Sequence, residues 1–490
     1  MHVNLKKLTN YGSIAMAAAV FAACSGGDSQ TTGWSYNDPD NGGFEVNTSY
    51  AGQETGPGLI FIEGGTFTMG RTEQDVMYDW DNRPRKATVS SFYMDEFEVT
   101  NVAYREYVYW LSRVYGESYP EVVTNALPDT LVWRTPMAFN EPLVENYYRH
   151  PAYLEYPVVG VNWLQATDYC KWRTDRVNEQ ILINEGILRQ NPNQYDDDVF
   201  TTDTYLYGLY IGEVRKNLND LNPNGNGKEG RHVRVEDGIL LPDYRLPTEA
   251  EWEFAALGLA GITEYERVAN RRLYPWDGHD TRSHYKNNKG QMLANYKRGK
   301  GDMMGTAGWL NDGYDISAPV GMFPPNDYGL YDMAGNVAEW VMDVYRPMST
   351  EDVDDFRAFR GNVYETLEKD EEGYLAEVDT LGRMQYREVT EEENLDRRNY
   401  RRSDYRDLHD GDVESSIYYD GQPEEGEAAM YDYGKTSIIN NTTRVYKGGS
   451  WKDRAYWLIP GTRRFLEQDQ ATDYIGFRCA MDRVGEPTEW

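Results

Sequence analysis

A short apolar run ending at a cysteine lies near the start of the sequence and indicates the cellular destination of the chain. Lys6 and Lys7 precede the run, which covers residues 14–23 and ends in Phe21-Ala-Ala-Cys24. A basic start, a brief apolar stretch and small residues before a cleavage point are typical of a secretory signal peptide. The run is much shorter than the ~20 residues that span a bilayer. We therefore expect this segment to be a secretory signal rather than a membrane span.

The same segment resembles a bacterial lipobox, in which the cysteine is acylated and becomes the first residue of the mature chain. Two or more acyl chains suffice for stable anchoring. We therefore predict a lipoprotein signal peptide over residues 1–23, with lipidation at Cys24. An ordinary signal peptide with an incidental cysteine is the alternative. Residues 24–57, rich in Gly, Ser, Thr and Asn, are expected to form a lipidated polar tether.

The cysteine count limits the chemistry open to the chain. It has three cysteines, Cys24, Cys170 and Cys479. If Cys24 carries lipid, the remaining two most simply form one disulfide in an exported protein. The closed loop of about 310 residues corresponds to roughly 5–6 kcal/mol in the chain-entropy model, and more realistically to about 2–4 kcal/mol. No free thiol would then remain.

Composition indicates a globular protein whose charge disfavours binding to nucleic acids. The net charge is -32, and such a field repels nucleic acids and anionic headgroups. It suits divalent cations or a basic protein partner. Aromatic residues make up 14% of the chain, too many for a disordered protein, and 45 glycines fit an irregular, loop-rich backbone.

Local patterns predict several regular elements. Alternating apolar residues predict strands over residues 58–63 and 91–99. Helices are expected to begin after Thr100, Asn162 and Thr248. At the last two positions, a Gln or Glu three residues later completes a reciprocal cap.

Two polar stretches look like insertions. Residues 174–243 contain helical patches and an Asn-Pro-Asn-Gly-Asn-Gly turn at 222–227. Residues 346–435 hold 26 acidic against 12 basic residues, with four arginines clustered at 397–402. A solvated, partly ordered surface loop and a partner-docking insertion are both compatible with the acidic stretch.

Nine segments occur in order between residues 58 and 483. They cover residues 64–70, 97–101, 156–163, 245–254, 274–276, 319–331, 335–340, 447–451 and 476–480. Together they resemble the formylglycine-generating enzyme family, also called the sulfatase-modifying-factor domain. The resemblance implies an α+β fold, a variant of the C-type lectin fold with little regular secondary structure and two long insertions. The domain would cover residues 58–483, followed by a tail over 484–490. The family also joins the positions of Cys170 and Cys479 by a disulfide.

Structural calcium is a further implication. Two turn-rich stretches offer the carboxylate, amide and carbonyl oxygens that calcium prefers. The resemblance implies two calcium ions, with ligands from Asn295, Tyr296, Asp312 and Tyr314 at one site and from Asp332, Gly335, Val337 and Glu339 at the other. The tyrosine, glycine and valine positions would supply carbonyl oxygens. Loops closed only by Asx-turn hydrogen bonds are the alternative.

The sequence departs from the family pattern at the residues that carry the family's oxidase chemistry. That chemistry uses two cysteines, five residues apart after a Gly-Gly-Ser motif, which bind copper(I) as thiolates. The matching positions hold Asp453 and Leu458, so we expect no copper and no catalysis. The six histidines also lack the His-x-x-x-His-x-Glu set of related iron enzymes, and no Gly-x-Ser-x-Gly elbow occurs.

A lipoprotein with an inactive domain of this kind resembles the gliding-motility and type IX secretion lipoproteins of Bacteroidetes, of the GldJ type and next of the GldK (PorK) type. This implies a non-catalytic outer-membrane scaffold, facing the periplasm, that binds other Gld- or Por-type proteins in a multi-protein complex. Two alternatives stay open. One is an enzyme using non-cysteine chemistry around Asp453, Arg454 or Arg463, and the other is a lectin-like glycan binder.

Overall fold

A computed structural model describes residues 28–47, 50, 52–71, 82–219, 221, 230–258, 272–276, 279–299, 311–346, 354–361, 363, 365–370, 372–390 and 442–485. The predicted signal peptide, Cys24, the turn at 222–227 and the arginine cluster at 397–402 lie outside these residues. No helix within the described ranges is long and apolar enough to cross a bilayer.

The chain forms two compact units. The smaller unit comprises the described residues of the stretches up to 52, 181–190 and 213–240, so it combines an N-terminal segment with part of the first predicted insertion. Within it, the Asp237 carboxylate accepts hydrogen bonds from the Arg231 guanidinium at 2.5 and 2.7 Å, and the Asn47 amide donates to the Asp237 carbonyl. The larger unit contains every sheet of the described residues.

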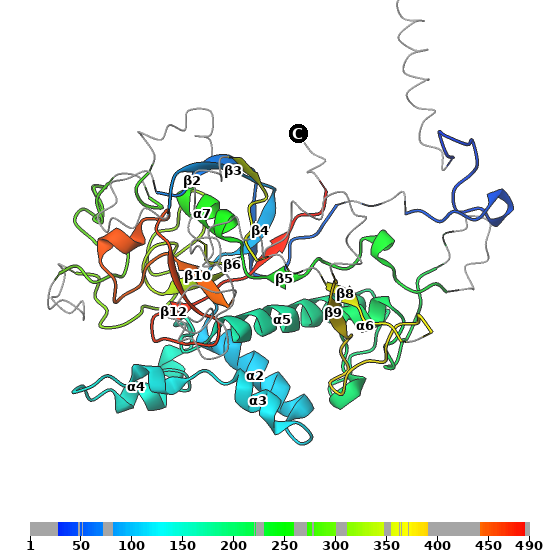
Figure 1. The fold of residues 1–490 in the computed structure, drawn as a ribbon, viewed down its shortest axis with the longest axis horizontal. Coiled ribbons are helices and arrows are strands. Elements are labelled where there is room, and N and C mark those ends of the chain that lie inside the picture. Colours follow the sequence, from blue (N-terminus) through cyan, green and yellow to red (C-terminus); the bar gives the residue numbers. More distant parts are fainter. Residues whose placement is uncertain are drawn as a thin grey trace, which may run out of the picture. The chain divides into compact units, whose positions relative to one another are not determined.

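Two four-stranded sheets form the frame of the larger unit (Figure 1). The first has the order β1-β4-β13-β5 and is antiparallel, with strands β1 Leu59–Ile62, β4 Phe92–Asp95, β13 Ala480–Asp482 and β5 Tyr244–Arg245. The second has the order β11-β10-β6-β12, with strands β11 Arg464–Glu467, β10 Thr443–Lys447, β6 Ala338–Val344 and β12 Ile475–Gly476. Strand β12 runs parallel to β6. The C-terminal motif therefore contributes to both sheets.

Two smaller sheets complete the strand content. The first contains β2 Gly65–Met69, β3 Arg85–Val89 and β7 Asp354–Phe356, and β7 runs parallel to β3. The second is a hairpin of β8 Glu365–Leu367 and β9 Tyr386–Glu388. The described part of the acidic stretch therefore pairs with the main body through β7 and also forms its own hairpin.

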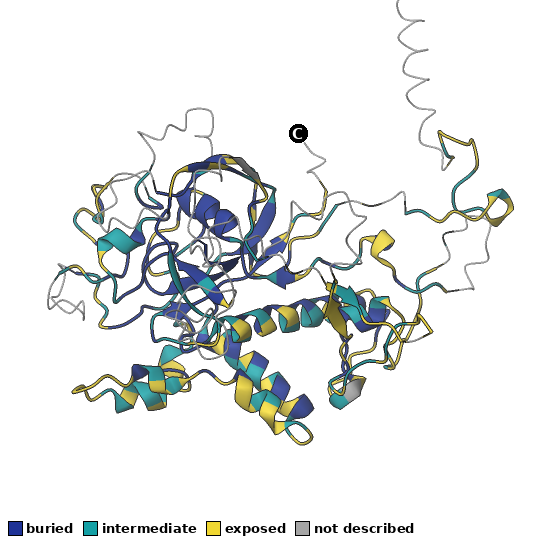
Figure 2. Ribbon diagram, in the orientation of Figure 1, coloured by how far each residue is buried: buried dark blue, intermediate teal, exposed yellow. Residues whose placement is uncertain are grey.

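Six α-helices accompany the sheets in the described residues. They are α2 Asn101–Tyr115, α3 Pro120–Ala126, α4 Glu141–Asn146, α5 Trp163–Asn184, α6 Thr202–Leu206 and α7 Glu249–Leu257. Every residue of α7 is buried, and this helix packs against β2, β3, β6 and β10. Figure 2 shows the buried residues concentrated on α7 and the neighbouring strands, whereas α2, α3 and α4 carry exposed faces. The main apolar core thus surrounds α7.

The local sequence predictions are largely confirmed. Thr100 caps α2, Asn162 and Gln165 exchange reciprocal hydrogen bonds before α5, and Thr248 and Glu251 form the capping box of α7. The predicted strand over 58–63 is β1. These signals depend on neighbours within a few residues, which is why sequence alone reveals them.

Two boundaries differ from the prediction. The second predicted strand ends at Asp95 rather than at 99, because the backbone beyond it leaves the ladder and Val99 N–H donates to the Phe477 carbonyl. Helix α5 continues eleven residues, 174–184, into the stretch predicted as an insertion. Thr174, Asn178 and Leu182 are buried at a spacing of four residues, and this gives the extension its own packed face.

Candidate functional site

The turn after β10 holds the residue that stands at the first expected copper-binding position. Both oxygens of the Asp453 carboxylate accept hydrogen bonds from the Arg464 guanidinium at 2.6 Å. Oδ2 also accepts the Ser450 hydroxyl hydrogen at 2.6 Å. A bidentate pair of this kind is directional and strong. Asp453 therefore ties the turn to β11, and its acceptor positions facing Arg464 and Ser450 are filled.

Arg464 is itself held from both sides. Its guanidinium carbon lies 4.8 Å from the centroid of the Tyr446 ring and 4.7 Å from that of Trp457. Cation–π contacts of this geometry fix the orientation of an arginine. The Asp453–Arg464 pair is therefore a rigid structural element.

Leu458 stands at the second expected copper-binding position. It is the last residue of a short 3₁₀-helix, η11 (Ala455–Leu458), and is fully buried. Its neighbours form one apolar cluster: Tyr274, Met292, Ala294, Tyr296 and Ala334. The position thus contributes to packing, and its side chain has no atom able to bind a metal.

The two cysteines predicted to pair lie together. Cys170, on α5, and Cys479, next to β13, are fully buried, and their Sγ atoms are 3.3 Å apart. The structure holds them as two thiols, and burial raises the pKa of Cys170 well above its usual range. A disulfide has an S–S length of about 2.05 Å, so the predicted bond requires a small movement. The bond itself stays a prediction.

The second predicted calcium loop contains a cluster of buried carboxylates. The Glu339 carboxylate accepts hydrogen bonds from Arg478 Nε and Nη2 at 2.7 Å and from the Trp252 indole at 2.7 Å. Asp332 accepts the Gly321 N–H at 2.9 Å. Burial is the main cause that raises the pKa of Asp332 to about 6. When both carboxylates are ionised, Arg478 alone does not balance the charges of Glu339 and Asp332.

Glu98 adds a third carboxylate to that cluster. It accepts hydrogen bonds from the Asn336 amide at 2.6 Å and from the Val337 N–H at 3.1 Å. Burial first, and then the charges of Asp332 and Glu339, raise the pKa of Glu98 well above its usual range. Glu98 lies in the 97–101 motif, but its role was not predicted, because its partners are about 240 residues away in the sequence.

The first predicted calcium loop packs directly against the second. The Asn295 carbonyl accepts the Asn336 N–H at 2.9 Å, and a Cβ atom at Gly335 would lie 2.4 Å from that carbonyl oxygen. Gly335 also has φ +86°, so a glycine is required there for two reasons. The Asp312 carboxylate accepts the Tyr314 N–H at 3.2 Å, in an Asx-type turn. The structure therefore brings the two predicted ligand loops together.

The predicted sites combine carboxylates with amide and carbonyl oxygens. No cluster of three or more His, Cys, Asp or Glu side chains with metal-binding geometry occurs among the described residues. The ligand chemistry nevertheless suits calcium, because calcium takes carbonyl and amide oxygens as readily as carboxylates. Calcium binding stays a prediction.

A buried ion-pair network links α7 to β10. Lys447 Nζ lies 2.9 Å from Glu253 Oε2 and 3.3 Å from Glu249 Oε1, and Arg463 Nε donates to Glu249 at 2.6 Å. Burial alone would raise the pKa of Glu249, but the Arg463 and Lys447 charges override it and lower this pKa to about 2. The network therefore holds the strand that leads into the Gly-Gly-Ser turn.

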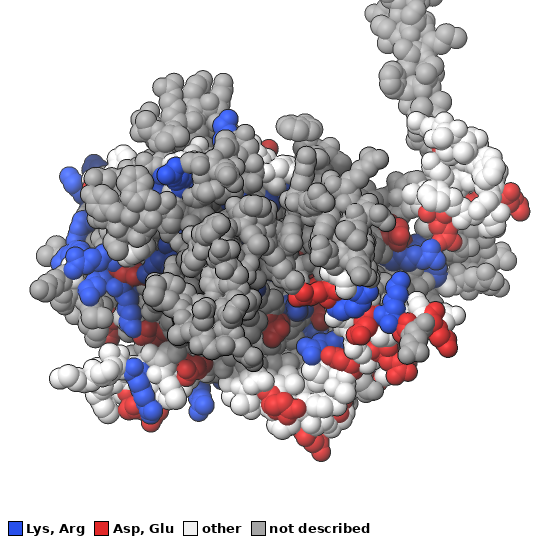
Figure 3. Space-filling model, viewed as in Figure 1, with Lys and Arg blue, Asp and Glu red and all other residues white. Residues whose placement is uncertain are grey.

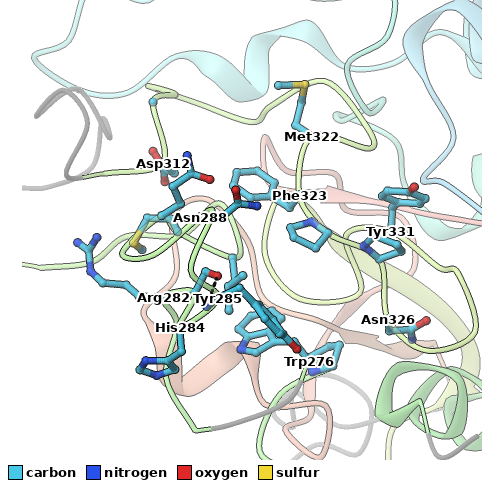
Figure 4. Close-up of a pocket in the computed structure, with 18 of the residues that line it drawn as sticks. Trp276, Arg282, His284, Tyr285, Asn288, Asp312, Met322, Phe323, Asn326 and Tyr331 are labelled. Carbon is cyan, nitrogen blue, oxygen red and sulfur yellow. Dashed lines mark hydrogen bonds between the residues drawn. The ribbon is translucent and has the colours of Figure 1, made fainter.

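A cavity of about 1400 Å³ opens beside the first predicted calcium loop (Figure 4). Its walls are loops over residues 275–276, 282–293, 311–314 and 322–331. Trp276 and Met292 line it and also belong to the apolar cluster around Leu458. The expected catalytic position therefore lies behind one wall of the cavity. Asp312 and Tyr314, which are predicted calcium ligands, contribute to another wall.

Comparison with known proteins gives the family. The FGE-sulfatase family model, the sulfatase-modifying factor enzyme 1-like domain, matches residues 45–483. The chain belongs to this family. Its match begins somewhat before the predicted boundary at residue 58.

Two mouse proteins of the family illustrate the range of relatives. The formylglycine-generating enzyme of Mus musculus is 26% identical over 342 residues, covering 67% of this chain and 70% of that protein. The inactive C-alpha-formylglycine-generating enzyme 2 of Mus musculus is 28% identical over 334 residues, covering 63% and 75%. The family therefore includes both active and inactive relatives of this chain.

A solved structure, Treponema denticola variable protein 1, aligns over 86% of this chain and 94% of its own, with 19% identity and a TM-score of 0.38. A TM-score this low supports no detailed comparison. The described residues of this sulfatase-modifying-factor protein have mixed helix and strand content.

The structure brings together two pairs of segments that the sequence singled out in this sulfatase-modifying-factor domain. Cys170 meets Cys479, and the loop of Asn295 meets that of Gly335. Asp453 and Leu458 do not share a site, since the first faces Arg464 and the second faces the apolar cluster. The cavity was not predicted, because its lining comes from loops with no periodic pattern.

Proposed function

We propose that this protein is a non-catalytic scaffold of the sulfatase-modifying-factor family. One observation carries the proposal: the position of one expected copper thiolate is an aspartate engaged by Arg464 and Ser450, and the other is a buried leucine. Copper(I) selects soft thiolate ligands, which neither residue provides. A relative that is named inactive is consistent with the absence of these thiolate ligands.

The cellular setting of the proposal comes from the N-terminal sequence and from the resemblance stated above. We infer an outer-membrane lipoprotein, acylated at Cys24 and facing the periplasm, that works in type IX secretion and gliding motility with other Gld- or Por-type proteins. An anchor confines the domain to a membrane surface and raises its effective concentration for neighbours. The disulfide and two structural calcium ions would stiffen the loop-rich fold. Calcium would be held by the two ligand loops and would neutralise buried carboxylates.

The acidic stretch supplies a docking surface for a basic partner. Glu365 and Glu388 lie directly opposite each other across the β8–β9 hairpin. Like charges at such positions destabilise a hairpin that has only two strands. In Figure 3, acidic side chains, with some basic ones between them, lie over the region of α6 and this hairpin. A basic partner would be attracted to these acidic side chains and associate in a fast, salt-sensitive manner.

The body of the protein supports the hairpin from two sides. The Tyr386 hydroxyl donates to Asp203 of α6 at 2.7 Å, and the Tyr115 hydroxyl of α2 donates to the Leu381 carbonyl at 2.9 Å. These contacts hold the acidic side chains on a fixed base, which reduces the ordering cost of binding.

The decisive experiment is gentle affinity purification of the tagged protein from native membranes, with quantitative mass spectrometry of its partners and of Cys24. We expect an acylated protein together with other secretion or motility components. The double variant Glu365→Gln/Glu388→Gln should reduce partner recovery several-fold. Glu121→Gln/Glu145→Gln, which changes two exposed glutamates of α3 and α4, is the matched control. Recovery of a lone, unacylated protein would refute the scaffold.

Catalysis by other groups is tested at the same turn. Asp453→Asn keeps the shape of the side chain but removes the charge that faces Arg464. If secretion and motility persist in cells whose variant protein folds and assembles, the scaffold role is supported. Loss of function with normal folding and assembly would instead favour an enzyme that uses non-cysteine chemistry.

A further inference from the structure

The large cavity has a lining that suits an uncharged ligand rich in hydroxyl groups. Aromatic surfaces come from Trp276, Tyr285, Phe323 and Tyr331. In Figure 4 the labelled rings lie around the hollow, while the Arg282 and His284 side chains point away from them. The Trp276 ring stacks on Tyr274 at 5.0 Å between centroids, and the Tyr331 ring stacks on Phe97 at 4.9 Å. These rings are therefore fixed before any ligand arrives.

Amide side chains supply the hydrogen-bonding groups. Asn287, Asn288 and Gln291 line the cavity, and their side chains make no hydrogen bond to any part of the chain that the structure describes. Each amide offers both a carbonyl acceptor and two N–H donors. A sugar hydroxyl is likewise donor and acceptor, and a sugar ring also has an apolar C–H face. Aromatic faces together with planar amides match both properties of a saccharide.

The charges around the cavity disfavour ionic ligands. Arg282 is the one lysine or arginine among the described lining residues, and its guanidinium donates to the Gly290 carbonyl at 2.6 Å. Asp327 pairs with Arg272 at 2.5 Å, and Asp312 accepts the Tyr314 N–H. An anion would also face the field of a chain with net charge -32. A neutral ligand avoids both difficulties.

Shape distinguishes a saccharide from a peptide. No residue of a described strand lines the cavity, so an extended peptide finds no sheet edge with which to form a backbone ladder. The volume of about 1400 Å³ exceeds the 300–1,000 Å³ typical of sites for a single drug-sized molecule. An oligosaccharide of several units fits such a space.

We propose that the cavity lined by residues 275–276, 282–293, 311–314 and 322–331 is a binding site for a neutral oligosaccharide. Tyr285 and Trp276 provide stacking faces, and Asn288 provides hydrogen bonds to hydroxyl groups. The site is independent of the scaffold role, because its walls share no residue with the β8–β9 hairpin. It also needs no catalytic group, because the position of Leu458 lies behind the wall.

The test is isothermal titration calorimetry of the full chain, purified in detergent, with maltotetraose, cellotetraose, mannotetraose and chitotetraose. All titrations contain calcium, so that the Asp312 loop is in one state throughout. We expect at least one of these sugars to bind with Kd below ~1 mM, and tetragalacturonate and an uncharged proline-rich peptide not to bind. Tyr285→Ala and Asn288→Ala should each weaken binding at least about tenfold.

Tyr109→Ala is the matched control for this experiment. Tyr109 lies on α2, away from the cavity, and its exposed fraction of 70% equals the 71% of Tyr285 within error. This variant should bind the sugar as the unchanged protein does. The proposal is overturned if none of the four sugars binds at about 5 mM. It is equally overturned if the peptide or tetragalacturonate binds as tightly, or if either cavity variant retains full affinity.

Discussion

Lys447→Met removes one charge from the buried network between β10 and α7. The four charged side chains of this network, Lys447, Arg463, Glu249 and Glu253, balance one another and are almost completely buried. Met fills nearly the same space as Lys, so little cavity is created. The variant removes the positive charge that lies 2.9 Å from Glu253 and 3.3 Å from Glu249. Breaking a buried pair by removing one partner costs about 3–5 kcal/mol, a large share of the ~5–15 kcal/mol that stabilises a domain.

The double variant Lys447→Met/Glu253→Gln isolates the electrostatic part of that cost. Gln can keep the acceptor that receives the Gly70 N–H at 2.8 Å, while the network becomes neutral again. We expect the double variant to lose only about 1–3 kcal/mol, the cost of an unsatisfied amide group. The assay is urea unfolding followed by tryptophan fluorescence.

An exposed pair provides the control for these variants. Arg134→Met breaks the Arg134–Glu141 pair, whose side chains are 57% and 41% exposed, and should leave the unfolding midpoint unchanged. The reasoning is refuted if Lys447→Met costs less than about 1 kcal/mol. It is also refuted if the double variant is less stable than the single one, because restoring neutrality would then bring no gain.

Three further results are expected. If Cys170 and Cys479 form a disulfide, maleimide should label neither of them in the unreduced, denatured protein. Reduction should lower the free energy of unfolding by about 2–4 kcal/mol. Labelling of both cysteines before reduction would contradict the disulfide. Burial, and then the Glu249 charge, raises the pKa of Asp343 to about 7, so the folded state holds a proton that the unfolded chain releases near pH ~4. Stability should therefore fall as pH rises from about 4 to about 7, and urea unfolding at several pH values should show a flatter slope in Asp343→Asn. Removal of calcium with EDTA should lower the melting temperature, and Asp332→Asn should reduce that effect; a metal-free protein with an EDTA-insensitive midpoint would exclude the calcium sites.

Sequence reasoning succeeded where a structural cause lies within a few residues. The cap of Thr248 and Glu251 needs only a hydroxyl and a carboxylate three positions apart, and the structure contains it as predicted. Asp453 and Leu458 could be matched to the two expected copper-binding positions by counting residues from the Gly-Gly-Ser motif. The sequence did not predict the partners of these two residues. Arg464, for example, binds Asp453 from strand β11.

Interactions over long separations explain most of what the sequence left open. Arg478 pairs with Glu339 across 139 residues, and Glu98 reaches Asn336 across 238. No periodic pattern marks such partners, since each lies in a loop or short strand whose position depends on the whole fold. The extension of α5 beyond residue 174 was missed for another reason: its buried face includes the polar residues Thr174 and Asn178, which read as solvent-exposed in the sequence.

Leu458, at an expected copper-binding position, packs against two residues that line the cavity. Leu458 completes a cluster whose outer members, Trp276 and Met292, line the cavity. A leucine there adds packing behind the wall, whereas a metal-binding thiolate would place a charge in the same apolar cluster. Loss of the expected metal ligands is therefore compatible with a stable cavity. The proposed scaffold role and the proposed saccharide site therefore place no conflicting demand on the position of Leu458.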